Sequence, residues 1–280
     1  MRKMGALGAF AVLALGLTAC GFTSASRPAS RTRTAASTRA SASVPASPAK
    51  MARAVYAYMT AHTKVPVGLP LTIPLPAHYR WLTATVGGYS AGYDVFYYAT
   101  HRPVPMGTSR NPTAPKMAPV VLQLSGNVPV SPLPAGAVAR LDYFWTNLLL
   151  GPAPGGHRVG SGDPVPIRLP DGVSAVKYQN WGDTIQWTSG TWTIVVLVGG
   201  TPSLGIPTAN EVSQLLARTP LPPFTGLAAI SVAVGTEPTY VIGMTWMRGQ
   251  YVYTLSDQQA QLEGPARVFA LIRALQWSQP

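Results

Sequence analysis

The stretch WTSGTWTI at residues 187–194 is matched by WMRGQYVY at residues 246–253, and both have the form Trp-x-x-Gly-x-aromatic. Aromatic and β-branched residues, which favour strands, stand on both sides of the glycine in each stretch. Gly190 and Gly249 tolerate the positive φ angle that a tight hairpin turn requires. Each stretch therefore predicts two antiparallel strands joined by a short turn.

A helical pattern follows each of these hairpins. After the first, apolar residues recur at helical spacing up to Leu216, and we interpret Asn210 as the cap of this helix. After the second, the same spacing runs from Pro265, which suits a first helical turn, to Leu275. A Leu-Pro pair and a further possible strand precede each hairpin, so the sequence predicts a unit that occurs more than once.

A third and more degenerate unit lies upstream, before residue 150. Its expected elements are strands at 79–86, 92–98 and 120–124 and a helix delayed to 135–150. One more helix is expected at 49–62, with Val55, Tyr56 and Met59 facing inward.

Repeated units at about 69–150, 165–218 and 219–277 predict the fold class. We expect one α+β domain over residues 51–280, in which strand–hairpin–helix units build an antiparallel sheet with helices packed on one face. The alternative is chance similarity between two short Trp/Gly hairpins.

The N-terminus carries the features of an export signal. Arg2 and Lys3 precede an apolar run over residues 5–19, which is shorter than the roughly 20 residues that span a bilayer. The run ends in Leu17-Thr18-Ala19-Cys20, which resembles a bacterial lipobox. This resemblance implies cleavage before Cys20 and transfer of diacylglycerol to its thiol. The alternatives are an ordinary cleaved signal with an accidental cysteine, or an uncleaved anchor.

Cys20 is the only cysteine of the chain. No other thiol competes for the lipid, and no intramolecular disulfide can form, so the exported domain must be held by its own core. Residues 21–50 are almost entirely Ser, Ala, Thr, Pro and Arg with no acid. We expect residues 1–19 to be a lipoprotein signal peptide and residues 20–50 to be the lipidated cysteine with a disordered basic tether. The expected location is the cell membrane, on the side facing away from the cytoplasm.

The second hairpin, at 246–253, also supports a family resemblance. Over about residues 165–276 the chain resembles modules of membrane-tethered lipoproteins of Gram-positive bacteria, including the C-terminal domains of some anti-sigma and sporulation-type proteins. In those modules a Trp-x-x-Gly-x-aromatic-Val-Tyr hairpin is followed by a closing Ala-rich helix. The resemblance implies a binding or sensing role in the cell envelope and no catalytic activity.

One catalytic motif is present. Gly88-Tyr89-Ser90-Ala91-Gly92 fits the Gly-x-Ser-x-Gly nucleophile elbow, but strand-forming residues 93–98 follow where that motif needs a helix. A hairpin turn is therefore the favoured interpretation, and we expect no enzyme. The alternative is a secreted hydrolase that uses Ser90 or a pair of carboxylates that meet only in space.

Aromatic residues are the remaining candidates for a site. Trp187, Trp192, Trp246 and Tyr251 would form a stacking platform for glycans or hydrophobic ligands if they faced outward; the alternative is that they pack in the core. The four histidines lie far apart in sequence, so we expect no metal and no cofactor. Expected partners are the membrane, through diacylglycerol on Cys20, and an envelope glycan or protein. Because most of the basic excess lies outside residues 51–280, no nucleic acid is expected.

The acid content predicts one physical property. Charged residues are 11% of the chain, and only nine are Asp or Glu. Acid unfolding follows largely from protonation of native carboxylates, so this domain is expected to lose little stability at low pH.

Overall fold

The structure is a computed structural model, which describes residues 47–134, 136–140, 163–179, 183–199, 202–234, 238–257 and 264–278. The strands are β1 (Gly68–Pro70), β2 (Trp81–Tyr89), β3 (Gly92–Thr100), β4 (Gly107–Thr108), β5 (Val120–Asn127), β6 (Pro164–Arg168), β7 (Ser174–Gln179), β8 (Asp183–Ser189), β9 (Trp192–Gly199), β10 (Thr225–Val234), β11 (Pro238–Arg248), β12 (Tyr251–Asp257) and β13 (Leu275–Trp277). The helices are α1 (Pro48–His62), α3 (Gly205–Arg218) and α4 (Gly264–Arg273), with short 3-10 turns η1 (Ala137–Ala139) and η2 (Pro202–Leu204).

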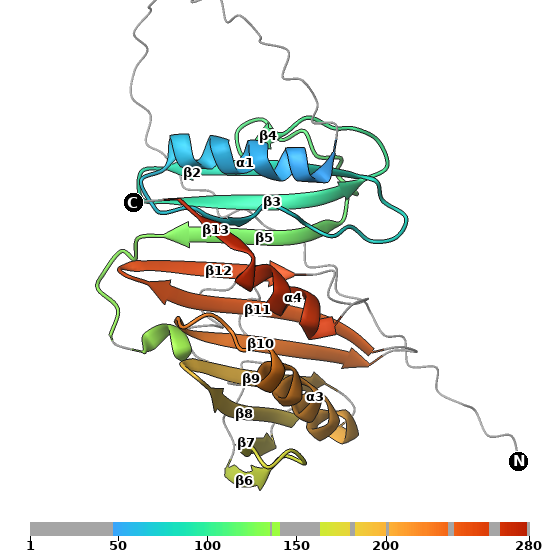
Figure 1. Ribbon diagram of the computed structural model, residues 1–280, viewed down its shortest axis with the longest axis vertical. Helices are drawn as coiled ribbons and strands as arrows, with labels where there is room; N and C mark the ends of the chain where they lie inside the picture. The colour runs from blue at the N-terminus through green and yellow to red at the C-terminus, as the bar shows by residue number, and fades with distance from the viewer. Residues whose placement is uncertain are drawn as a thin grey trace, which may run out of the picture. The chain divides into compact units, whose positions relative to one another are not determined.

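One large sheet dominates the described part of the chain (Figure 1). Its eleven strands have the order β4-β2-β3-β5-β12-β11-β10-β9-β8-β7-β6. The sheet is mixed, because β9 pairs with β10 in parallel and β2 pairs with β4 in parallel, whereas the other neighbours are antiparallel. The predicted fold class, an α+β domain of strand–hairpin–helix units on an antiparallel sheet, is therefore wrong: the fold is mostly β.

The predicted fold class is wrong because of how the chain connects β9 to β10. Parallel neighbours need a crossover, usually a helix, and α3 supplies it here by returning the chain to the same end of the sheet. A hairpin followed by a helical pattern does not reveal which strand the chain pairs with after the helix. The local patterns were therefore compatible with more than one sheet.

Several local predictions are confirmed. The two hairpins form as β8–β9 and β11–β12, and the turn residues Gly190 and Gly249 have φ angles of 60° and 62°. The predicted helix at 49–62 is α1, whose first turn is capped by Ser47, since Ser47 Oγ accepts a hydrogen bond from Lys50 N at 3.3 Å. The strand predicted at 120–124 is the first part of β5.

Other boundaries differ. Asn210 is not a cap, because α3 begins five residues earlier, at Gly205, and Asn210 lies inside it. Leu275 lies in β13 and not on α4, which ends at Arg273. The helix predicted at 135–150 falls mainly outside the described residues.

The described helices pack against one face of the sheet. In Figure 1 the helices α1, α3 and α4 lie on the near side of the sheet, which we call the front face. On β3, the front-face residues Tyr93, Val95 and Tyr97 are fully buried, whereas the alternate residues Phe96 and Tyr98 are half-buried on the opposite side, the rear face. The continuous hydrophobic core therefore lies between the sheet and its helices.

A short ribbon of β1 and β13 is joined to this core by two tyrosines. The Tyr93 hydroxyl accepts a hydrogen bond from Gly68 N at 3.1 Å and donates to Gly68 O at 3.3 Å, and the Tyr253 hydroxyl donates to Pro66 O at 3.0 Å. Burial raises the pKa of both phenols. Both hydroxyls therefore keep their protons and remain donors.

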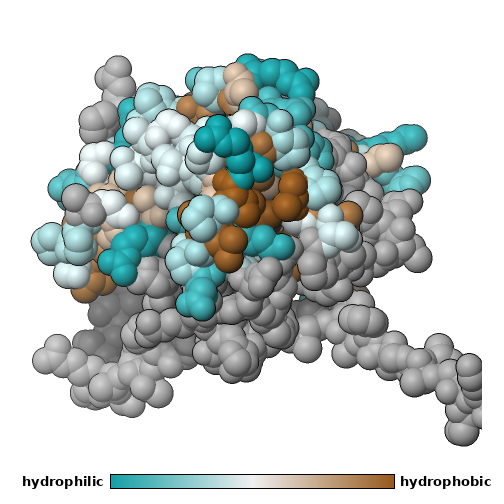
Figure 2. Space-filling view, turned by 90° about the horizontal axis from the view of Figure 1, so that it is seen from below, coloured by the Kyte–Doolittle hydropathy of each residue, from teal (hydrophilic) through white to brown (hydrophobic). Residues whose placement is uncertain are grey.

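The edge strand β6 is protected against pairing with another chain. Pro164 and Pro166 have no N–H to offer, which is typical of exposed sheet edges. Figure 2 views the molecule from this end and shows a group of hydrophobic residues among hydrophilic ones. Val165 of β6 is 44% exposed.

Candidate functional site

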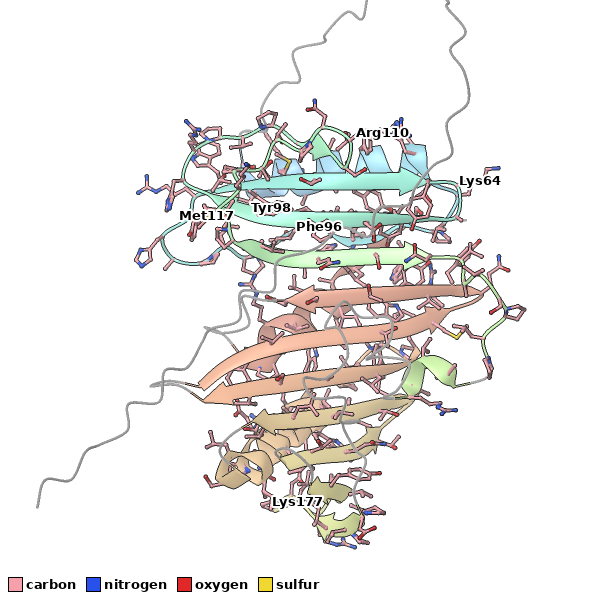
Figure 3. All side chains as sticks on the ribbon, turned by 180° about the vertical axis from the view of Figure 1, so that it is seen from behind. Lys64, Phe96, Tyr98, Arg110, Met117 and Lys177 are labelled. Atoms are coloured by element: carbon pink, nitrogen blue, oxygen red, sulfur yellow. The ribbon has the colours of Figure 1, made fainter. Side chains whose placement is uncertain are left out.

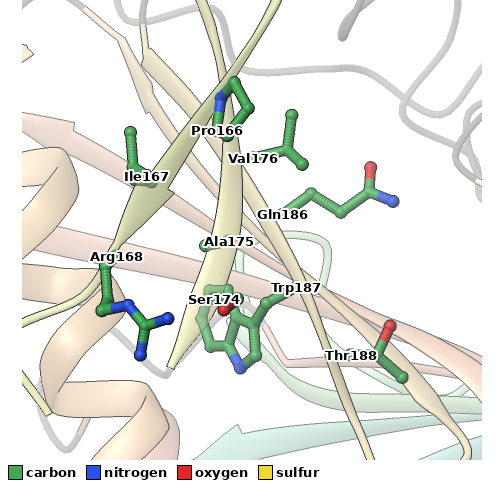
Figure 4. Close-up of a pocket in the computed structure, with 9 residues that line it drawn as sticks. All are labelled: Pro166, Ile167, Arg168, Ser174, Ala175, Val176, Gln186, Trp187 and Thr188. Atoms are coloured by element: carbon green, nitrogen blue, oxygen red, sulfur yellow. The ribbon is translucent and has the colours of Figure 1, made fainter. Parts of the chain in front are cut away.

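A shallow groove of about 620 Å³ lies over β6, β7 and β8 (Figure 4). Nine residues line it: Pro166, Ile167, Arg168, Ser174, Ala175, Val176, Gln186, Trp187 and Thr188. Strand register brings them together, since Val176 pairs with both Pro166 and Gln186, and Arg168 pairs with Ser174. Side chains that are register partners point to the same face of a sheet. The groove is therefore lined by rows of neighbouring side chains that run across β6, β7 and β8.

Arg168 carries the charge of this groove. Its Nη1 donates a hydrogen bond to Gly172 O at 3.2 Å, within the turn that joins β6 to β7. The side chain of Asp171 in the same turn is engaged elsewhere, because its Oδ1 accepts from Val173 N at 3.2 Å. No ion pair of Arg168 is found in the described part of the chain, so most of its guanidinium donors face solvent.

The chemistry of the lining favours binding over reaction. Gln186, Ser174 and Thr188 offer an amide and two hydroxyls, and Pro166 and Val176 offer flat aliphatic surface. The nine lining residues include no histidine or carboxylate that would act as a general base toward Ser174. The groove therefore suits a ligand with many hydroxyl groups and an anionic group opposite Arg168.

The tryptophans that the sequence suggested as a platform are core residues. The exposed fractions of Trp187, Trp192 and Trp246 are 4%, 1% and 0%. Trp192 Nε1 donates to Pro222 O at 2.7 Å. Tyr251 is half-buried. The three tryptophans present no exposed ring for a ligand to stack on, because they are packed in the core.

Trp192 and Trp246 belong to one aromatic cluster at the front face. Trp246 lies at centroid distances of 5.7 Å from Tyr253, 6.3 Å from Trp192 and 6.4 Å from Phe224. Trp277 of β13 meets Tyr253 edge-on at 4.9 Å. Such contacts stabilise the packing of the sheet against the ribbon above it.

Ser90 lies exposed in the turn between β2 and β3, where the sequence predicted a hairpin turn. The ring of His101 stacks on Tyr79 at a centroid distance of 4.5 Å, at the opposite end of the same hairpin. Strands of this length extend over roughly 30 Å, so Ser90 has neither His78 nor His101 beside it. His62 of α1 lies nearer the motif, since a methyl group built on Gly88 would come within 3.3 Å of His62 Cβ, but the Nδ1 of His62 lies 2.7 Å from Tyr58 O.

Cys20, the predicted lipidation site, lies outside the described residues. Over the ranges that the structure describes, no helix has both the length and the apolar composition needed to cross a bilayer. The same ranges contain no group of three His, Cys, Asp or Glu side chains placed to hold a metal ion.

Asp94 on β3 has a perturbed pKa. Burial raises the pKa of the Asp94 carboxyl above its ordinary value. An acid with a higher pKa in the folded state binds its proton more tightly there, so its contribution to stability is present at low pH and is lost as the pH rises through the raised pKa. This direction agrees with the expectation of acid tolerance from the small number of carboxylates.

The sequence pattern pointed to Trp187 but not to the polar residues around it. Arg168, Val176 and Gln186 stand on different strands and are brought together by register alone. The available signal was the alternation of polar Gln186 and Thr188 with apolar Ile185 and Trp187, which indicates that this strand has one polar face.

No family model matches the chain, and neither the curated proteins nor the solved structures give a match.

Proposed function

We propose that this chain is a lipid-anchored extracytoplasmic protein that binds an anionic envelope glycan in the groove of β6, β7 and β8. The observation that carries the anchoring is Leu17-Thr18-Ala19-Cys20 at the end of an apolar export segment, with no second cysteine in the chain. The segment that follows Cys20 is rich in Ser, Ala, Thr, Pro and Arg and carries no acid, and it would serve as a spacer at the membrane surface. Two acyl chains give stable attachment.

The groove supports the choice of ligand class. Arg168 is the only ionisable residue among the nine described residues that line the groove, so this part of the lining favours an anion. A guanidinium binds carboxylate or phosphate groups through paired hydrogen bonds. Gln186, Ser174 and Thr188 supply donors and acceptors for sugar hydroxyls. A glycan that carries carboxylates or phosphates meets both requirements.

Lipidation at Cys20 is tested by metabolic labelling of the full chain with an alkyne fatty acid in a Gram-positive host. We expect labelled protein that enters the detergent phase on Triton X-114 partition, and Cys20→Ser is expected to lose essentially all label and leave that phase. The matched control is Cys20→Ser with Ser24→Cys, which keeps one thiol but moves it out of the lipobox. Labelling of the double variant, or no labelling of the wild type, would overturn the anchor.

Ligand binding is tested with the mature chain in detergent and polygalacturonate as the anionic probe, with neutral dextran for comparison. Arg168→Gln is expected to weaken polygalacturonate binding about tenfold or more, because it removes charge-assisted hydrogen bonds. Arg218→Gln is the control, since Arg218 is also exposed and its Nε donates to one backbone carbonyl, Gln214 O, at 3.3 Å. Equal losses in both variants, or equally tight binding of dextran, would contradict a site at Arg168.

A further inference from the structure

A second feature of the rear face lies far along the sheet from the groove. β3 places Asp94 between Gly87 of β2 and Ser125 of β5. Its pKa is raised by burial alone, with no contribution from an opposite charge or from a hydrogen bond. No hydrogen bond or ion pair of this carboxylate is found among the described residues. A partly buried carboxylate without a partner costs stability, so its presence calls for a reason.

Gly87 creates space beside this carboxylate. A methyl group built on Gly87 would contact only the side chain of Ser109, with Oγ at 3.4 Å and Cβ at 3.6 Å. The neighbouring position toward β5 is Asp94 itself. We call the set Gly87, Asp94, Ser109 and Ser125 the Asp94 notch; it brings one carboxylate and two hydroxyls around a glycine.

The notch continues into a row of hydroxyls across the sheet. Ser125 is 6% exposed, and its Oγ lies 2.6 Å from Thr254 Oγ1 on β12. Thr245 of β11 is the register partner of Thr254; it is fully buried, and its Oγ1 has no hydrogen-bond partner in the described part of the chain. The row therefore lines up hydroxyl groups beside one carboxylate; those of Ser125 and Thr254 bond to each other, that of Thr245 is buried, and no basic side chain belongs to the row.

Aromatic surface adjoins the notch along β3. Phe96 and Tyr98 follow Asp94 on the rear face, and both are half-buried (Figure 3). An aromatic ring attracts a cation at its face and packs against the apolar face of a sugar ring. The notch and its surroundings therefore combine a counter-ion, hydroxyl acceptors and aromatic surface.

We propose that the Asp94 notch binds the protonated amino group of an amino sugar. An ammonium group has three donors and no acceptor, which matches one carboxylate and nearby hydroxyl oxygens. A divalent metal fits less well, because it prefers several oxygen ligands and Asp94 is the only carboxylate of the notch. Phe96 and the hydroxyl row favour a sugar as the carrier of the amine over a flexible lysine side chain. This site is separate from the groove and does not depend on the function proposed for it.

The test is isothermal titration of the mature chain in detergent with a glucosamine trimer, compared with the fully N-acetylated trimer, which has the same rings without the charge. We expect the charged trimer to bind and the acetylated trimer to bind at least tenfold more weakly. Asp94→Asn, which keeps the size of the side chain, is expected to weaken binding of the glucosamine trimer about tenfold or more. Gly87→Val, which fills the notch and leaves the charge, is expected to do the same while circular dichroism remains unchanged.

Asp163→Asn is the matched control, because Asp163 is an exposed carboxylate away from the notch, and it is expected to bind as the wild type does. Three results would overturn the proposal: no binding of the glucosamine trimer, equal binding by the wild type and Asp94→Asn, or equal binding of the two trimers. Trilysine that binds as tightly as the glucosamine trimer would overturn the assignment to an amino sugar.

Discussion

Replacement of Arg267 by methionine is expected to lower the free energy of unfolding by about 3–5 kcal/mol. Arg267 Nε lies 3.0 Å from Asp257 Oδ2, and the two side chains are only 3% and 0% exposed. Arg267 Nη2 also donates to Pro74 O at 3.0 Å. The guanidinium thus joins α4 to the end of β12 and to the segment after β1. Without it, the Asp257 carboxylate stays buried but loses this ion pair.

Urea unfolding of the mature chain, followed by circular dichroism, measures this loss. Arg273→Met is the control on the same helix, because Arg273 is exposed and its Nη1 donates to Thr219 O at 2.9 Å. We expect it to cost about 1 kcal/mol or less. Arg267→Met combined with Asp257→Leu is expected to recover part of the stability, because a buried pair replaced by apolar residues is often tolerated. Equal costs for Arg267→Met and Arg273→Met would show that the buried pair does not hold α4 in place.

Features set by neighbouring residues could be predicted from the sequence. The turns at Gly190 and Gly249 depend on a backbone conformation that glycine adopts readily, and the first turn of α1 depends on Ser47 and Pro48, which lie beside it in the chain. Strand alternation on β3 likewise follows from the residues of that strand alone. Such elements need no knowledge of distant pairing.

The sheet and the sites depend on pairing between distant segments, which these patterns do not encode. β12 lies between β5 and β11, so its neighbour β5 comes from more than a hundred residues earlier in the chain. Asp94 acquires its notch from Gly87 and Ser125, and Arg168 acquires its groove from β7 and β8. The tryptophans were ambiguous for the same reason, since alternation places them on one face but does not say which face the helices cover.

Substitution of Trp246 by alanine is expected to cost about 3–5 kcal/mol. Trp246 is fully buried, and its ring contacts Tyr253, Trp192 and Phe224 at the centre of the aromatic cluster. Its Nε1 has no hydrogen-bond partner among the described residues, so the loss arises from packing and the cavity left behind. Trp246→Phe, which keeps an aromatic ring and removes the unpartnered N–H, is therefore expected to cost clearly less.

The comparison that decides between core and platform is Tyr251→Ala, at an aromatic residue of the same hairpin that is half-buried. Less apolar surface is lost from the core there, so urea unfolding is expected to show a loss clearly smaller than that of Trp246→Ala. A second readout is titration of Trp246→Phe with polygalacturonate and the glucosamine trimer, for which we expect wild-type affinity. Similar stability losses for Trp246→Ala and Tyr251→Ala would contradict the central place of Trp246 in the core. A loss of affinity in Trp246→Phe with stability unchanged would mean that Trp246 contacts a ligand.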